Sequence, residues 1–472
     1  MNILVCFKIA VDPDSILPED WTQFRPSRIT SYAGTELNCF DSSALELGLR
    51  LKEQTGGTLT AATAAPFLHP SFAERLYSVG ADRVVQLRME DCEFCPEAVA
   101  AALAQQGEAA DLILCGQMAA MAESGQVPYD LSRRLGWPVV AGVEEMAWEN
   151  DALRMIVRKS SALVKMTVRL PLVGVVGNCP AVLRAATLRQ RMANRGKTAE
   201  ITEVSRASAP NPQLIRPQMG RSCTMLDPEK PETLSLIRRL MTQQERPAQQ
   251  TACPASPGLT ILPDTAEGRM EAVQLAKRTG AGLQFGGELL DITPDAVTVR
   301  TAVCGGNLHW IKNLSLPLVM TAADAPPREE RTQPAWITEE QILEEAAPNR
   351  LPQAATAVIC GCGMGSRASC DRARQLAQDL GAGFGLTRPA ALNAWGRPNE
   401  IVGQSGAALR CTCCLVLGAA GAGAFVQGIE RAETVIAVNT DPHALIFQHA
   451  DYGLLMDAGT LVRKLLEGGD IL

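Results

Sequence analysis

The chain has 472 residues, a net charge of -7 from 44 Lys and Arg against 51 Asp and Glu, and only 4% aromatic residues. This length predicts two or three domains. The acidic balance excludes a basic nucleic-acid surface, and no apolar run reaches the ~18 residues of a membrane span, so we expect neither nucleic-acid binding nor membrane insertion.

Residues 1–204 alternate short apolar runs with helical periods, which predicts a mostly parallel sheet with right-handed crossovers. Strands are expected at Ile3–Phe7, Leu59–Ala64, Arg83–Leu87, Leu112–Cys115 and Leu172–Val176. Between them lie four segments, Ser42–Glu53, Ser71–Val79, Pro96–Gln106 and Gln126–Leu135, and the last three are expected to be helices because their apolar residues recur three and four apart.

The rest of the chain divides into three parts. Residues 205–258 are rich in proline and polar residues, which predicts a linker with one helix at Pro231–Gln243. Residues 259–350 regain an α/β pattern, although a second linker is expected over 323–354. Residues 351–472 form the last domain. Its predicted elements are strands at Ala357–Cys360, Cys414–Leu417 and Thr434–Val438 and helices at Ser369–Leu380 and Thr460–Leu466.

The cysteines give no metal-site pattern. Cys92-x-x-Cys95 lacks a second pair at zinc spacing, and Cys411, Cys413 and Cys414 run into an apolar strand. We predict no metal and no catalytic constellation. Fifteen cysteines and a chain that begins in a strand favour a cytoplasmic protein without a signal peptide.

Glycine-rich and polar loops follow successive strands of the last domain. They are Gly361–Ser366, Gly385–Pro389, Val402–Gly406, Gly418–Phe425 and Val438–Pro442. Each alone is compatible with a simple turn. Because ligands of open α/β sheets bind at the carboxyl ends of the strands, the loops together predict a nucleotide cofactor.

In these motifs the chain resembles the electron transfer flavoprotein family. Residues 355–472 resemble the end of its α subunit through Leu380–Ala382, Thr387-Arg388, Val402–Gly406 and Asn439–Gly453. Residues 1–204 resemble its β subunit through Ile3–Lys8, Leu37–Asp41, Ala44–Glu53, Gly80–Arg83, Asp111–Gly116, Gly125–Val127 and Leu170–Val173. Residues 259–322 resemble part of the α subunit's first domain through Arg278–Leu283 and Val303–Leu308. The resemblance implies a β–α fusion with a shortened α N-terminal domain.

The resemblance implies an α/β fold of two packed parallel-sheet domains and a C-terminal Rossmann-like domain that binds FAD. Arg388 would lie over the isoalloxazine, Ser405 would bond flavin N5, and Asn439 and Asp457 would hold the adenosine end. The full implied set is Gly361, Cys362, Gly363, Thr387, Arg388, Val402, Gly403, Gln404, Ser405, Ala420, Gly421, Ala422, Gly423, Ala424, Phe425, Asn439 and Asp457.

Two residues of this set depart from the family. Phe425 stands where the family has a histidine that donates to the flavin and stabilises its anionic reduced states. Cys362 stands where the family commonly has an arginine near the pyrophosphate. The resemblance therefore implies that the electronic properties of the flavin and the affinity for FAD differ in this chain from those of the family.

The β-like half resembles a second nucleotide site, which holds AMP in plain carriers and a second FAD in bifurcating members. Its implied residues are Asn38, Phe40, Asp41, Ala65, Gly116, Glu123, Ser124, Gln126 and Val127. The family's acidic loop is reduced to one carboxylate, Glu123, and its acidic hairpin to Lys159–Ala162. Occupancy by a nucleotide and a purely structural role both stay open.

Three functions follow. The leading hypothesis is an electron carrier without a substrate of its own, between a flavoprotein dehydrogenase, such as an acyl-CoA dehydrogenase, and a downstream acceptor. The alternatives are a bifurcating, NADH-linked flavoprotein with a second FAD and a non-redox nucleotide-binding protein. The linkers are expected to let the FAD domain move.

Overall fold

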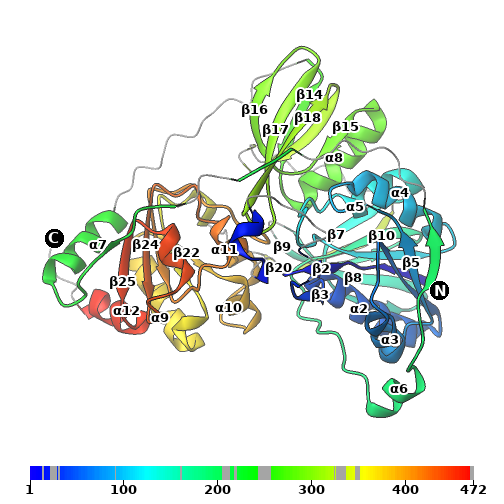
Figure 1. The fold of residues 1–472 in the computed structure, drawn as a ribbon, viewed down its shortest axis with the longest axis horizontal. Coiled ribbons are helices and arrows are strands. Elements are labelled where there is room, and N and C mark those ends of the chain that lie inside the picture. The colour runs from blue at the N-terminus through cyan, green and yellow to red at the C-terminus, as the bar shows by residue number, and fades with distance from the viewer. Residues whose placement is uncertain are drawn as a thin grey trace. The chain divides into compact units, whose positions relative to one another are not determined.

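The computed structural model describes residues 1–12, 15–21, 29, 32–90, 92–159, 162–204, 213–216, 220–242, 257–323, 325, 336–345 and 351–467. The chain forms two compact units. The first comprises residues 1–215, 252–304 and 309–346, and the second residues 216–251, 305–308 and 347–472 (Figure 1). Among the described residues, no helix has the length and apolar character to cross a bilayer.

The first unit is built on a ten-stranded sheet (Figure 1). In spatial order its strands are β11 (Glu200–Glu203), β5 (Arg83–Arg88), β4 (Thr58–Ala65), β1 (Asn2–Cys6), β6 (Leu112–Gly116), β10 (Leu172–Val176), β7 (Val139–Glu149), β8 (Ala152–Arg158), β9 (Ala162–Val168) and β20 (Ile337–Glu345). The strands from β11 to β7 are parallel, and β7, β8, β9 and β20 pair antiparallel. The order β5-β4-β1-β6-β10 places the switch point of the doubly wound sheet between β1 and β6.

Both faces of this sheet are covered by helices. The helices are α2 (Cys39–Thr55), α3 (Pro70–Val79), α4 (Pro96–Gly107), α5 (Val127–Leu135) and the short α6 (Leu188–Ala193). Because side chains alternate along a strand, Ile3 and Val5 of β1 pack with α2 and α3, whereas Leu4 and Cys6 pack with α4 and α5. A short hairpin, β2 (Ile9–Val11) and β3 (Thr35–Leu37), and the 3-10 turn η2 (Pro18–Trp21) follow β1.

A smaller layer in the same unit is formed by residues 213–215, 259–304 and 309–322. It contains α8 (Ala266–Thr279) and a parallel sheet of β14 (Leu259–Pro263), β19 (Leu318–Ala322) and β15 (Gly282–Gln284). A second sheet contains β12 (Gln213–Ile215), β18 (Leu308–Ser315), β17 (Ala296–Val303) and β16 (Glu288–Ile292). Val273 of α8 and Phe285 share one core with Leu131 of α5, so this layer is packed on the first sheet.

The second unit is a six-stranded parallel sheet (Figure 1). In order its strands are β13 (Thr224–Met225), β25 (Tyr452–Leu455), β24 (Thr434–Asn439), β23 (Cys413–Leu417), β21 (Thr356–Cys360) and β22 (Gly383–Leu386). Its helices are α7 (Pro231–Met241), α9 (Arg367–Asp379), α10 (Arg388–Leu392), α11 (Gly423–Val426) and α12 (Ala458–Glu467), and its 3-10 turns are η3 (Leu351–Gln353), η4 (Cys362–Met364), η5 (Pro398–Glu400) and η6 (Leu445–His449). The order of the last five strands puts the switch point between β21 and β23.

The structure confirms the α/β class, and the strands and helices predicted in both units are present within a few residues of their expected ends. The linker expected over 323–354 is wrong for residues 337–345, because β20 pairs with β9. Of residues 205–258, β12 pairs with β18 and α7 packs in the core of the second unit. The other residues of both predicted linkers lie largely outside the described ranges.

Candidate nucleotide-binding sites

At the switch point of the second unit, the loop after β21 lies directly against the loop after β23. The N–H of Gly361 donates to the carbonyl of Leu417, and the N–H of Gly363 donates to that of Gly418, both at 2.8 Å. A Cβ atom at Gly363 would lie 2.8 Å from the Cα of Gly418, closer than side chains approach. These glycines are therefore required for the two loops to meet.

Backbone and side-chain hydrogen bonds extend this contact into one row of loops. The N–H of Val402 donates to Leu386 at the end of β22, and the N–H of Gln404 donates to Ala424 beyond β23, both at 2.8 Å. The Asn439 amide at the end of β24 donates to the carbonyl of Ala419 at 2.9 Å. The structure thus brings the predicted residues of four strand ends to the same edge of the sheet.

Arg388 and Gln404 offer hydrogen-bond donors at this edge. Arg388 opens α10, directly after Thr387, whose N–H donates to Cys360 at 2.9 Å. The Nε2 atom of Gln404 is buried, and none of the described residues accepts a hydrogen bond from it. A buried amide donor without an acceptor fits a polar cofactor at this position.

Three of the predicted residues have positions or contacts that favour a cofactor less clearly than those of Arg388 and Gln404. Phe425 is buried in the core with Val402 and Ile446. Asp457 uses Oδ1 to cap α12, accepting the N–H of Thr460 at 2.7 Å. Cys362 is an exposed residue. Desolvation of its thiol by the neighbouring residues raises the pKa of the thiol, so Cys362 offers a neutral thiol to a ligand.

The remaining predicted residues of this set lie in the same loops. Gly403 has φ 124° and packs on the backbone of Ala424, and Gly421 has φ 91° and packs on Ile446. Ser405, Ala420, Ala422 and Gly423 lie between or beside these contacts along the chain. The glycines therefore hold the loops in close contact, which is a structural reason for their presence beside any cofactor role.

At the switch point of the first unit, a buried carboxyl group joins two strand ends. Oδ2 of Asp41 accepts the N–H of Lys8 after β1, and Oδ1 accepts the N–H of Gly116 at the end of β6, both at 2.9 Å. Burial raises the pKa of Asp41 to about 6 despite these hydrogen bonds. A Cβ at Gly116 would lie 2.4 Å from Oδ1 of Asp41, so only glycine permits this contact.

The neighbouring predicted residues are largely engaged by the protein itself. The Asn38 amide donates to the carbonyl of Met118 at 2.9 Å, and the Gln126 amide donates to Asp130 at 3.0 Å. Phe40 is buried beside Gly116. Ala65 ends β4, and Val127 begins α5.

The loop between β6 and α5 has an unusual backbone. Met121, Glu123 and Gly125 have positive φ angles of 79°, 53° and 58°, so every second residue is left-handed. Successive N–H groups in such an alternation point to one side and form a concavity that binds anions. Within the described ranges, no acceptor is found for the N–H groups of Ala122, Ser124 and Gly125, although Ala122 and Ser124 are buried. This loop, at the N-terminus of α5, fits a phosphate group.

One charged residue beside this loop was missed by the sequence analysis. Arg269 lies in the first turn of α8, and its Nη1 atom would be 2.8 Å from a Cβ at Gly125. The two positions are far apart in the sequence, so no motif joins them. The only local signal is the helix start Asp264-Thr265 that precedes the arginine.

Comparison with known proteins gives two family matches. Residues 29–209 match the electron transfer flavoprotein domain, and residues 350–430 match the electron transfer flavoprotein FAD-binding domain. The chain is 30% identical over 226 residues to Protein FixB of Escherichia coli O1:K1 and of Escherichia coli strain K12, which covers 44% of this chain and 72% of each relative.

A solved structure of a proposed thiamin diphosphate-dependent enzyme from Mycobacterium smegmatis aligns with 33% of this chain and 35% of its own, at 14% identity and a TM-score of 0.17. A score this low supports no argument about fold or function.

Proposed function

Because the chain belongs to the electron transfer flavoprotein family, we propose that it carries electrons on FAD bound at the switch point of the second unit, from a flavoprotein dehydrogenase to a downstream acceptor. The observation that carries this proposal is the row of loops across four strand ends, which includes the buried Gln404 amide that no described residue accepts a hydrogen bond from. FAD, when bound there, supplies the redox chemistry.

We assign the side chains around FAD from their positions in the loops. The Arg388 guanidinium favours a reduced, negatively charged flavin, because opposite charges attract strongly where water is excluded. Gln404 donates to an acceptor on the cofactor, and Ser405 in the same loop offers a hydroxyl. Phe425 offers no hydrogen bond, so this chain stabilises negative charge on the flavin with fewer donors than a histidine would supply.

We further propose that the chain fuses a β-like half with a shortened α-like half. The order of the two family matches along the chain and the length of the FixB match support this. Fusion keeps the two halves at a high effective concentration. A separate partner subunit is then not needed to complete the carrier.

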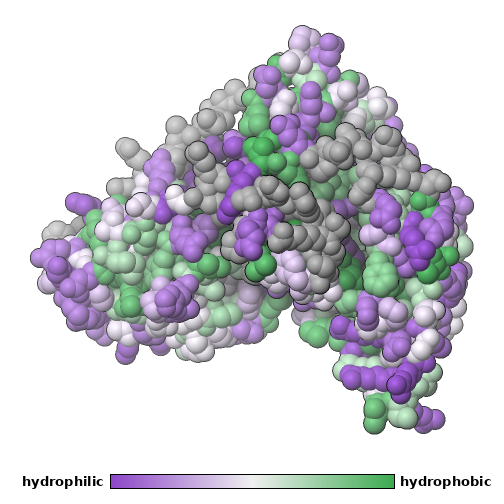
Figure 2. Space-filling view, viewed as in Figure 1, coloured by the Kyte–Doolittle hydropathy of each residue, from purple (hydrophilic) through white to green (hydrophobic). Residues whose placement is uncertain are grey.

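The short helix α6 is proposed to contact the dehydrogenase. Leu188 and Met192 are 74% and 70% exposed and lie one turn apart on the same face of α6. The helix α6 lies at a tip of the first unit (Figure 1), and hydrophobic residues are visible on the surface of that tip (Figure 2). Exposed apolar side chains on an ordered element are typical of protein interfaces. The segment 188–197 also carries Arg189, Arg191, Arg195 and Lys197 without an acidic residue, which favours a partner with an acidic rim.

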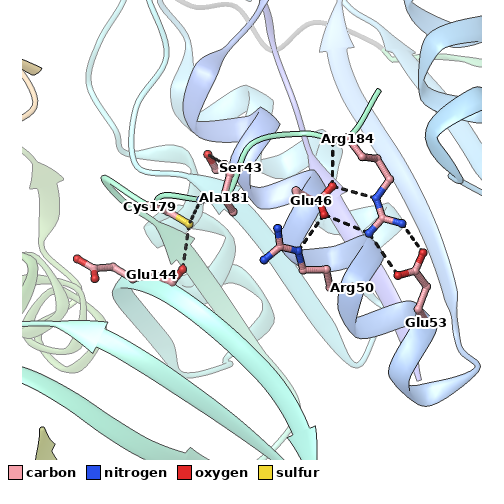
Figure 3. Close-up of polar contacts among 8 residues, drawn as sticks. All are labelled: Ser43, Glu46, Arg50, Glu53, Glu144, Cys179, Ala181 and Arg184. Carbon is pink, nitrogen blue, oxygen red and sulfur yellow. Dashed lines mark hydrogen bonds and ion pairs between the residues drawn. The ribbon is translucent and has the colours of Figure 1, made fainter. Parts of the chain in front are cut away.

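The chain leading to α6 is held firmly on α2 (Figure 3). Arg184 donates from Nε and Nη2 to the buried carboxylate of Glu46 at 3.0 and 3.1 Å, and it also pairs with Glu53. Ser43 donates to the carbonyl of Ala181 at 2.7 Å. Burial would raise the pKa of Glu46, but the hydrogen bonds of Arg184 and Arg50 hold it below its ordinary value. An anchored segment presents α6 with little loss of conformational entropy on docking.

For the first unit we propose a bound nucleotide whose phosphate lies on the loop of residues 121–126. The alternating backbone supports a phosphate here, as do the N–H groups of Ala122, Ser124 and Gly125, for which the described residues provide no acceptor. AMP is the leading candidate. A second FAD, which would make the protein bifurcating, shares the same phosphate chemistry.

The test is the absorbance spectrum of the purified protein together with its nucleotide content after denaturation. One FAD and one AMP per chain are expected of the proposed carrier. Two FAD per chain would instead establish the bifurcating alternative, and NADH should then reduce the protein directly. A colourless chain that takes up no added FAD would contradict the proposed carrier function and favour a non-redox nucleotide-binding protein.

A further inference from the structure

A partly buried ion pair joins the start of α8 to the end of β14. Arg269 donates to Asp264 through two nitrogens, from Nε to Oδ1 at 2.6 Å and from Nη2 to Oδ2 at 3.1 Å. Thr321 donates to Oδ1 of the same carboxylate at 2.6 Å. The guanidinium carbon lies 5.3 Å from the centre of the Phe285 ring. Asp264 therefore holds one edge of the guanidinium, and the Phe285 ring covers one of its faces, so that its orientation is fixed.

The third nitrogen of this guanidinium, Nη1, is not used by Asp264. It lies against Gly125, where a Cβ would be only 2.8 Å away. Gly125 belongs to the loop whose N–H groups at residues 122, 124 and 125 have no acceptor within the described ranges. A cationic N–H edge and a set of backbone donors thus lie side by side in the first unit, although they come from segments that resemble different subunits.

We propose that Arg269 binds the phosphate of the nucleotide held by the loop 121–126, so that the α-like segment completes a site of the β-like segment. This inference rests on the nucleotide proposed above for the first unit. Asp264 and Thr321 are positioning residues that hold the guanidinium with Nη1 toward the phosphate.

A second cation near the loop, Lys8, is already neutralised by the protein. Lys8, after β1, pairs with Glu93 and donates to the carbonyl of Ala120 at 2.9 Å. A phosphate carries up to two negative charges, and a fixed arginine edge matches its oxygens better than a flexible ammonium group does. Arg269 is therefore the side chain best placed to supply the charge.

The experiment compares the binding of AMP and of adenosine by calorimetry, in FAD-loaded protein freed of its other nucleotide. Adenosine lacks the phosphate, so the ratio of the two affinities isolates the phosphate interaction. The variants are Arg269→Gln, Arg269→Lys and Asp264→Asn. Arg278→Gln, an exposed arginine on the same helix, is the matched control.

Arg269→Gln is expected to weaken AMP binding at least about tenfold and to leave adenosine binding within about twofold, as the loss of a charged hydrogen bond implies. Arg269→Lys should retain part of the preference for AMP. Asp264→Asn, whose amide oxygen still accepts one hydrogen bond from Arg269, should keep the preference for AMP over adenosine but bind AMP somewhat more weakly than the parent, and less weakly than in Arg269→Gln. An unchanged AMP-to-adenosine ratio in folded Arg269→Gln would overturn the role of Arg269 while leaving the nucleotide site intact. A parent protein that binds neither ligand would overturn the nucleotide site itself.

If Arg269→Gln does not fold, Arg269→Lys and Asp264→Asn decide the question. A purely structural ion pair predicts that both lose AMP and adenosine binding together, in step with stability. A phosphate ligand predicts that Asp264→Asn keeps the preference for AMP even where it lowers stability.

Discussion

Oδ1 of Asp41 lies 2.9 Å from the backbone nitrogen of Gly116 and accepts its hydrogen bond across the switch point of the first sheet. The contact stabilises the meeting of two strand ends, yet it places a carboxyl group out of water. Burial raises the pKa of Asp41, and likewise that of Asp130 on α5, from 3.8 to about 6. Among the described residues of the first unit, these two carboxyl groups therefore take up a proton at a higher pH than a carboxyl group in water does.

A pH-dependent effect on stability follows for Asp130. Its pKa is higher in the folded than in the unfolded protein, so its contribution to stability is complete below pH 3.8 and is lost as the pH rises through 6. Asp130→Asn, which cannot ionise, should gain about 2 to 3 kcal/mol in free energy of unfolding relative to the parent between pH 4 and pH 7. Urea titrations at several pH values measure this difference. A difference that is constant with pH would contradict the prediction.

The contact between the loops after β21 and β23 should be sensitive to a single methyl group. Gly363→Ala would press a Cβ against Gly418. We expect this variant to contain less FAD, and we expect the free energy of unfolding of the second unit to fall by about 1 to 3 kcal/mol. Gly365→Ala is the control, because Gly365 has φ 74° but open space around it. It should cost about 1 kcal/mol and retain FAD. Equal FAD contents in the two variants would argue against a role for this contact.

The charge of Arg388 should set the reduction potential of the flavin. Arg388→Gln removes the positive charge that we propose lies near the isoalloxazine, so the potential should fall by roughly 40 mV per electron, which is on the order of 1 kcal/mol. Spectroelectrochemical titration measures the shift. Arg372→Gln, which changes an exposed arginine of α9, should leave the potential within a few millivolts. A similar fall in both variants would show a general charge effect rather than a specific one.

Docking through α6 predicts a loss of electron transfer without loss of cofactor. Leu188→Ala should lower kcat/KM for reduction of the protein by its dehydrogenase about tenfold, as is typical of a central interface side chain. FAD content and unfolding should be unchanged, because the side chain is 74% exposed. Leu290→Ala, at a 46% exposed leucine elsewhere in the first unit, is the control. Reduction at the parental rate by Leu188→Ala would exclude α6 from the interface.

The elements predicted from the sequence are those whose periodicity is decided locally. The run Ile3–Phe7 and the helix over Ser71–Val79 have apolar spacings that only one element satisfies. The strands β8 and β9 were not predicted, because their outward positions mix apolar and charged residues and no continuous apolar run results. The strand β20 is rich in glutamate and becomes extended only because β9 offers a free edge.

The candidate sites, like the strands and helices, were predictable where the local sequence decides them and not where the packing of distant segments does. Glycines such as Gly361 and Gly418 can be recognised in the sequence as loop residues, because each directly follows an apolar strand. That they touch each other depends on strand order, which is a property of the folded sheet. The proximity of Arg269 to Gly125 depends on the packing of α8 on α5 and leaves no trace in any local pattern.

The helix α7 belongs to the second unit, although residues of the first unit, 257–304 and 309–345, follow it in the chain. Its buried residues Ile237 and Met241 pack on strands that begin only at Thr356. During synthesis, α7 therefore leaves the ribosome long before its partners exist, and its apolar face must stay soluble or shielded until the last strands emerge. For the same reason, a fragment that begins at β21 would lack α7 and therefore part of its own core. Expression of the FAD-binding unit alone requires that α7 be joined to this fragment.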